Sequence, residues 1–126
     1  MESNSVYLAV YGTLKVDERN YPLYLAPIRP IYQGKLNLNY QLYSNTDYPM
    51  LVPSKSPHSI VLEVFEISHT ILEKIDGLEE PYEYHREQIS LNIDGKTHSV
   101  EIYVYNHPIP PKGFHLLDHG EFKNGI

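Results

Sequence analysis

The 126-residue chain contains no cysteine. A disulfide scaffold, a thiolate nucleophile and a cysteine-ligated zinc site are therefore excluded. Tryptophan is also missing, and the aromatic residues are 12 tyrosines and 3 phenylalanines. Because tyrosine joins an apolar ring to a polar hydroxyl, this composition suits half-buried strands and pockets.

Basic residues are few and form no run. The chain has ten lysines and arginines and 16 acidic residues, which gives a net charge of -6. Binding of nucleic-acid phosphates needs clustered basic side chains, which this sequence lacks. Apolar stretches such as Val6–Tyr11 are far shorter than the ~20 residues of a membrane helix, and the Met-Glu-Ser-Asn-Ser start lacks the features of a signal peptide. We expect a cytoplasmic protein that binds neither nucleic acid nor membranes. One domain is expected over residues 1–126, and the sequence does not specify an oligomeric state.

Apolar runs and period-two alternation predict several strands. These segments are residues 6–11, 31–43, 60–67, 85–93 and 98–105. The first ends at Gly12, which predicts a tight turn after a buried strand. Residues 53–59 are predicted to be a loop. Asp94-Gly95 separates the last two strands and is typical of a two-residue hairpin turn.

One main helix is predicted over residues 69–79. Ser68 is a favourable N-cap, the apolar residues that follow it have helical spacing, and Pro81 ends the helix. Residues 17–25 have room for one helical turn before Pro22 limits it. The fold class is therefore α+β: a small, mixed, mostly antiparallel β-barrel or strongly bent sheet with one main helix packed against it.

Seven histidines raise the question of a metal site. His115 and His119 are four residues apart, which would place them on one face of a helix, but little in that segment predicts a helix. The histidines could therefore have structural or surface roles, or they could bind a metal. We expect no metal and no cofactor.

Two short motifs are candidates for chemistry. Tyr11-Gly12-Thr13-Leu14 directly follows the first strand, where consecutive backbone N–H groups form a nest for a carboxylate or phosphate, unless the segment is an ordinary turn. Asp76-Gly77-Leu78-Glu79-Glu80 lies at a helix C-terminus, where the helix dipole and neighbouring acids raise a carboxyl pKa. A raised pKa suits a general acid/base, although a solvated acidic loop is the plainer interpretation.

Taken together and in order, these motifs resemble the gamma-glutamylcyclotransferase-like family, in its gamma-glutamylamine cyclotransferase and avirulence-induced branch. The segments that carry the resemblance are VYLAVYGTLK, YP at Tyr48-Pro49, LEVFEIS, IDGLEE, YEYHR and IYVYN. The pattern covers nearly the whole chain. It implies a small β-barrel-like domain with helices packed against it.

The resemblance also implies roles for individual residues. Glu79 matches the catalytic glutamate of an Asp-x-x-Glu motif that begins at Asp76. The residues that match substrate-binding positions are Tyr11, Gly12, Thr13, Leu14, Tyr84 and Tyr105. Arg86 completes a Tyr-x-Arg motif, and the Gly120-Glu121-Phe122 segment resembles the family's closing segment.

The implied reaction releases 5-oxoproline and a free amine from a small γ-glutamyl substrate. The substrate's own α-amine attacks its γ-carbonyl, so neither a protein nucleophile nor a cofactor is required. Glu80 and Leu62 stand where the family usually has glycine, and we expect both to alter the pocket wall. A non-catalytic small-molecule binding or regulatory module on the same fold is therefore the alternative.

Overall fold

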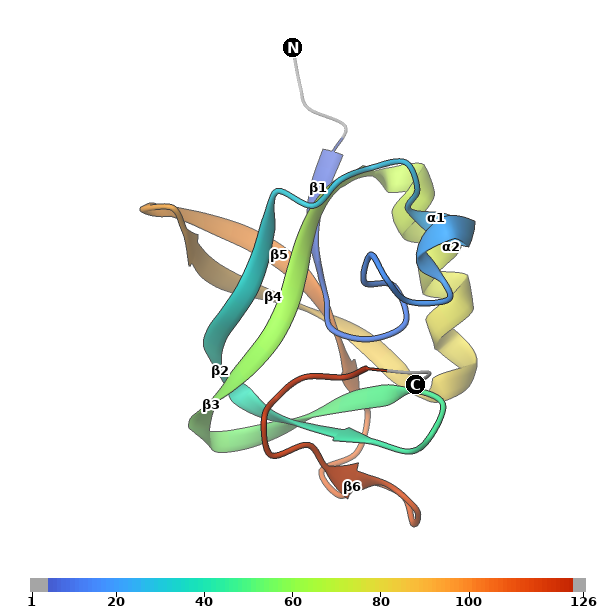
Figure 1. Ribbon diagram of the computed structural model, residues 1–126, viewed down its shortest axis with the longest axis vertical. Helices are drawn as coiled ribbons and strands as arrows, with labels where there is room; N and C mark the ends of the chain where they lie inside the picture. Colours follow the sequence, from blue (N-terminus) through green and yellow to red (C-terminus); the bar gives the residue numbers. More distant parts are fainter. Residues whose placement is uncertain (1–4, 124–126) are drawn as a thin grey trace.

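The computed structural model describes residues 5–123, and its core is one six-stranded sheet (Figure 1). The strands are β1 (Ser5–Val10), β2 (Tyr32–Ser44), β3 (Pro49–Ser68), β4 (Tyr84–Ile93), β5 (Lys96–Tyr105) and β6 (His115–Leu116). Their order across the sheet is β4-β5-β1-β3-β2-β6. Only β1 and β5 pair in parallel, so the predicted mixed and mostly antiparallel arrangement is confirmed.

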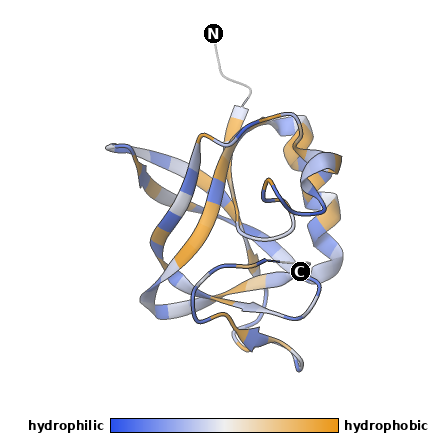
Figure 2. Ribbon diagram, in the orientation of Figure 1, coloured by the Kyte–Doolittle hydropathy of each residue, from blue (hydrophilic) through white to orange (hydrophobic). Residues whose placement is uncertain are grey.

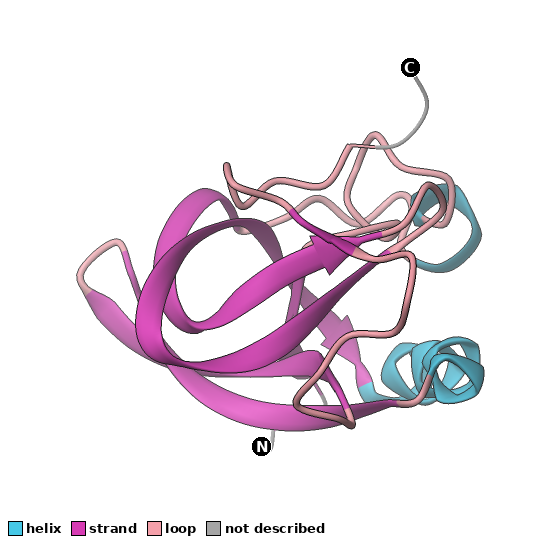
Figure 3. Ribbon diagram, turned by 90° about the horizontal axis from the view of Figure 1, so that it is seen from below, coloured by secondary structure: helices cyan, strands magenta, loops and turns pink. Residues whose placement is uncertain are grey.

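The sheet curls strongly but stays open, which corrects the expectation of a barrel (Figure 3). No backbone pairing joins the edge strands β4 and β6 within residues 5–123. A side-chain contact spans part of the gap, because the Tyr40 hydroxyl on β2 donates a hydrogen bond to the Glu87 carboxylate on β4. The two ends of the curl are therefore linked by side chains and by packing rather than by a ladder.

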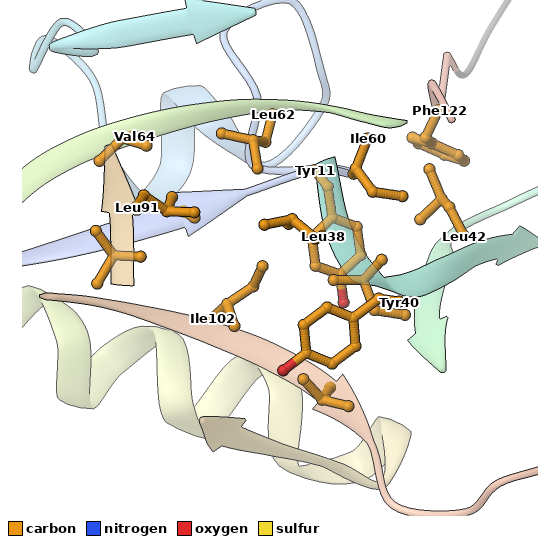
Figure 4. Packing of buried hydrophobic residues seen from close by; sticks show 14 of the residues in the cluster. Tyr11, Leu38, Tyr40, Leu42, Ile60, Leu62, Val64, Leu91, Ile102 and Phe122 are labelled. Atoms are coloured by element: carbon orange, nitrogen blue, oxygen red, sulfur yellow. The ribbon is translucent and has the colours of Figure 1, made fainter. Parts of the chain in front are cut away.

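Apolar and polar residues alternate along the strands (Figure 2). Each face of the sheet buries its own cluster. The inner cluster fills the curl and includes Tyr11, Leu38, Tyr40, Leu62 and Ile102 (Figure 4). The outer cluster packs the sheet against the helices. Strand β1 contributes to both clusters, which explains why its sequence is apolar from Val6 to Val10.

Two helices cover one side of the sheet. The short α1 (Tyr21–Tyr24) contains Pro22, as the sequence predicts, and the main helix α2 (His69–Glu79) has the predicted bounds. Leu72 and Ile75 of α2 are buried against the sheet. The 3₁₀ turn η1 (Glu80–Tyr82) contains Pro81 and follows α2 directly. No helix among the described residues is long and apolar enough to cross a membrane.

The predicted loop over residues 53–59 is wrong. Strand β3 runs through it, and β2 pairs with β3 on both sides of an irregularity at which Asn39 alone faces residues 54–57. The long ladder on either side carries the strand across a segment whose serines and prolines favour a loop locally. The predicted hairpin is confirmed, since Asp94 and Gly95 both have positive φ between β4 and β5.

The end of the described chain returns to the first loop. Lys15 is buried, and its Nζ donates a hydrogen bond to the Phe122 carbonyl at 2.7 Å. Phe122 itself is buried in the inner cluster. The loop that follows β1 is thus held from both ends of the sequence.

We predict that removing the cap of α2 destabilises the protein. The Ser68 hydroxyl accepts a hydrogen bond from the Ile71 N–H at 3.2 Å, as the sequence predicts. Ser68→Ala should lower the free energy of unfolding by about 1 kcal/mol, measured by urea denaturation, whereas Ser68→Asn, which retains a capping oxygen, should lose much less. An equal loss in both variants would contradict a capping role.

Candidate active site

Segments far apart in the sequence meet at one cleft that is open to solvent. They are the end of β1 with its loop, the turn between β2 and β3, the end of α2 with η1, the start of β4, and the end of β5. The lining residues are Ala9, Val10, Tyr11, Gly12, Thr13, Leu14, Arg19, Asn20, Tyr48, Pro49, Leu78, Glu79, Tyr82, Tyr84 and Tyr103. The predicted loop and the predicted glutamate therefore line the same cleft.

Gly12 is required by a close approach of backbone to side chain. A Cβ at this position would lie 2.4 Å from Cγ of Pro49, far inside van der Waals contact. The predicted tight turn is present, since the Lys15 N–H donates to the Gly12 carbonyl at 3.0 Å, but the φ of Gly12 is not among the positive values, so the turn itself does not require glycine. Pro49 begins β3, and the absence of a side chain at Gly12 lets the first loop and the β2–β3 turn form one wall.

Two loop residues that line the cleft, Thr13 and Leu14, have backbone N–H groups without an acceptor within residues 5–123. The loop is held by Asn20 instead, whose N–H donates to the Thr13 carbonyl and whose Nδ2 donates to Thr13 Oγ1, both at 2.8 Å. Consecutive free N–H groups in a fixed loop form an anion-binding nest.

Glu79 is the last residue of α2 and is half-buried in the cleft. Burial, and to a lesser extent the negative charge of Asp76, raises the pKa of the Glu79 carboxyl from 4.5 to about 7. Loss of hydration disfavours the ionised form. Glu79 thus exchanges a proton readily near neutral pH, as a general acid/base must.

A polar network fixes Asp76 one helical turn before Glu79. Asp76 Oδ1 accepts hydrogen bonds from the Tyr103 hydroxyl at 2.6 Å and from Arg86 Nε at 2.7 Å. Arg86 also binds Glu101 at 2.6 Å. Arg86 does not line the cleft, so this motif residue orients the end of α2 rather than facing a ligand.

Besides Tyr103, two further tyrosines of the cleft have their hydroxyls engaged within the protein. The Tyr11 hydroxyl donates to the Tyr103 carbonyl at 2.7 Å and points into the core (Figure 4). The Tyr84 hydroxyl donates to the Pro49 carbonyl. Burial raises the pKa of both hydroxyls, so they stay neutral donors. Both side chains hold the walls of the cleft together.

Tyr105 does not line the cleft, although the resemblance implies a place near the substrate. It is buried in a neighbouring cluster with Met50 and Val52, against the partly buried Tyr48 and Tyr84. Its ring therefore supports the cleft from behind.

Sequence reasoning missed an aromatic wall and a charged residue at the cleft. The Tyr48 and Tyr82 rings pack edge-to-face with centroids 4.6 Å apart, and the Tyr82 and Tyr84 rings are stacked at 6.0 Å. Arg19 is exposed at the rim. Tyr48 belongs to the Tyr48-Pro49 pair that the sequence did single out, so that pair was the available signal.

Glu80 and Leu62 do not form the cleft wall, contrary to expectation. Glu80 is exposed in η1, and Leu62 is fully buried in the inner cluster. Both departures from the family pattern therefore lie outside the lining of the cleft.

The histidines form no metal-binding group. Within residues 5–123, no three His, Cys, Asp or Glu side chains gather closely enough to hold a metal ion. His115 lies in the short strand β6 rather than on a helix. The shared helical face that His115 and His119 would need is absent.

We predict that ionised Glu79 destabilises the fold. Its pKa of about 7 lies above that of an ordinary glutamate, so wild-type stability should fall relative to Glu79→Gln as the pH rises from about 4.5 to about 7. The difference in the free energy of unfolding should approach about 3 kcal/mol above pH 7. Urea denaturation at pH 5 and pH 8 measures it. The exposed Glu80→Gln is the control, and a pH-independent difference for Glu79→Gln would contradict the burial of this charge.

Known structures share this fold. An uncharacterised protein from Pyrococcus horikoshii matches with a TM-score of 0.74 and 23% identity, over 93% of this chain and 89% of that chain. An AIG2-like protein from Mus musculus matches with a TM-score of 0.72 and 19% identity, over 96% of this chain and 90% of that chain. Both similarities show that the fold is shared.

Sequence similarity extends over the same region. A protein of Methanocaldococcus jannaschii that is provisionally named a gamma-glutamylcyclotransferase is 32% identical over 120 residues, which are 94% of this chain and 96% of the relative. The family profile described as gamma-glutamyl cyclotransferase, AIG2-like, matches residues 8–124. The chain therefore belongs to the gamma-glutamyl cyclotransferase, AIG2-like family.

Proposed function

We propose that this protein is a γ-glutamyl cyclotransferase that converts a γ-glutamyl amide into 5-oxoproline and a free amine. The observation that carries the proposal is that one cleft joins a half-buried glutamate of pKa about 7 to a loop with free backbone N–H groups. In the reaction, a bond forms between the substrate's α-nitrogen and its γ-carbon, and the γ-amide C–N bond breaks. The α-ammonium loses two protons in becoming the lactam N–H: one passes to solvent, and the other is carried to the departing nitrogen, which leaves as a neutral amine.

Glu79 is proposed to carry this proton. In its ionised form it accepts a proton from the α-ammonium, and in its protonated form it donates one to the leaving nitrogen. A pKa near the working pH makes both transfers accessible. The single carboxylate of the cleft lining thus serves as base and then as acid.

The loop is proposed to bind the glutamyl end. The N–H groups of Thr13 and Leu14 suit a carboxylate or a developing oxyanion, because backbone donors held in a loop need no reorganisation during the reaction. Asn20 fixes the loop through its two hydrogen bonds to Thr13. The aromatic wall of Tyr48, Tyr82 and Tyr84 limits the poses of the substrate, which favours a near-attack conformer.

The nucleophile belongs to the substrate, so the proposed reaction needs no cofactor. The reaction needs a group that carries a proton and donors that stabilise the carbonyl oxygen. We propose that Glu79 and the N–H groups of the loop fill these two roles. We propose that activity survives a chelator for the same reason.

A panel of γ-glutamyl compounds tests the proposed function. The purified protein is incubated with γ-glutamyl amino acids, γ-glutamyl amines and ε-(γ-glutamyl)-lysine, and 5-oxoproline is detected by mass. We expect at least one member to release 5-oxoproline together with a stoichiometric amine. No 5-oxoproline from any member would reject the enzyme in favour of a binding module.

We predict that Glu79→Gln lowers kcat by roughly 10²–10⁴-fold, the usual contribution of a general acid/base. The amide keeps the shape of the side chain but carries no titrating proton. Substrate binding should largely survive, because the loop supplies much of the recognition.

Glu80→Gln is the matched control, since Glu80 is exposed and lies outside the cleft lining. It should keep kcat within a few-fold of wild type. A loss confined to Glu80→Gln would place the proton shuttle one residue later, and full activity in both variants would place it elsewhere.

A further inference from the structure

The charges of the cleft are unlike those of the rest of the chain. The chain has a net charge of -6, but only two of the fifteen lining residues are charged, and they have opposite signs. Glu79 is half-buried, whereas Arg19 is exposed. The cleft is therefore acidic at depth and basic at its rim.

Arg19 has no anionic partner within the described part of the chain. The ion pairs of residues 5–123 involve other cations, namely His85, Arg86, His107 and Lys123. A guanidinium at the mouth of a cleft, without a carboxylate of its own, suits a carboxylate of a ligand.

The chain holds residue 19 beside the loop that is proposed to bind the glutamyl end. The adjacent Asn20 is bound to Thr13 through both its backbone N–H and its side chain, each at 2.8 Å. Glu18 on the other side donates its N–H to the Lys15 carbonyl at 2.9 Å. The backbone on either side of Arg19 is thus anchored to the loop, while its side chain reaches the solvent edge.

Three charges of one substrate class match this arrangement. A γ-glutamyl amino acid carries an α-ammonium and an α-carboxylate on its glutamyl half and a second carboxylate on its leaving half. Glu79 suits the ammonium, and the Thr13 and Leu14 N–H groups suit the α-carboxylate. With the glutamyl half placed at the loop and Glu79, as proposed above, the leaving half is left to extend toward the exposed rim that Arg19 lines.

We propose that Arg19 binds the carboxylate of the leaving amino acid and so makes the cleft selective for γ-glutamyl amino acids over γ-glutamyl amines. This inference rests on the proposed function. Arg19 takes no part in the proton transfers. It discriminates between substrates through one charged contact at the rim.

A matched pair of substrates isolates that contact. γ-Glutamyl-alanine and γ-glutamyl-ethylamine differ only by the leaving-group carboxylate, so contacts with the aromatic wall of Tyr48 and Tyr82 are the same for both. Wild type should prefer γ-glutamyl-alanine by about tenfold in kcat/KM, a value between those of buried and exposed charged contacts. Arg19→Gln should abolish the preference by a rise in KM for γ-glutamyl-alanine alone.

Arg29→Gln is the control, because it removes the same charge from an exposed residue outside the cleft lining. It should keep the wild-type preference. Equal losses on both substrates in Arg19→Gln would place the guanidinium on the glutamyl half and overturn the proposal. Unchanged kinetics in Arg19→Gln would overturn it as well.

Calorimetric binding of the same two compounds separates this proposal from the proposed function. If wild type releases no 5-oxoproline, the proposed function fails, but the binding preference and its loss in Arg19→Gln still decide the role of Arg19. Tighter binding of γ-glutamyl-alanine to wild type, with no difference in Arg19→Gln, supports the proposal. Equal binding of the two compounds to wild type overturns it.

Discussion

The contact between Gly12 and Pro49 is the constraint on which the cleft depends. No side chain fits between them, since a Cβ on Gly12 would lie 2.4 Å from the proline ring. The same proline accepts a hydrogen bond from the Tyr84 hydroxyl through its carbonyl. One buried residue thus joins the loop after β1, the turn before β3 and the start of β4. The cleft is the space that these three segments leave against the end of α2.

The chemistry of the cleft follows from burial rather than from an unusual residue type. Glutamate ends many helices, but Glu79 lies in a cleft that tyrosines also line, and burial there removes hydration from its carboxyl and raises its pKa. Asp76 adds a smaller effect of the same sign, while Arg86 and Tyr103 hold Asp76 in place. Removing water thus gives an ordinary carboxyl the proton affinity that catalysis near neutral pH needs.

Local sequence signals predicted the elements well and the cleft lining only in part. Ser68 and the apolar spacing after it specify α2, and Asp94-Gly95 specifies a hairpin, because both depend on neighbours within a few residues. The path of β3 through residues 53–59 depends on pairing with β2, and the presence of Arg19 and Tyr82 at one rim depends on where distant strands end. Tyr105 is the opposite case. The motif match predicts a position near a substrate, but in the structure its ring packs in a cluster with Met50 and Val52, outside the cleft lining.

The hydrogen bond from Lys15 to the Phe122 carbonyl joins residues 107 positions apart. The first loop also depends on β1, whose partners in β3 and β5 lie far along the chain. Nearly the whole chain must therefore be synthesised before the contacts that shape the loop exist, and closing such long segments is slow compared with forming a helix. A fragment ending before β5 would contain both Gly12 and Glu79 but would lack Tyr103 and the parallel partner of β1. The complete cleft therefore forms only when almost all of the described chain is present.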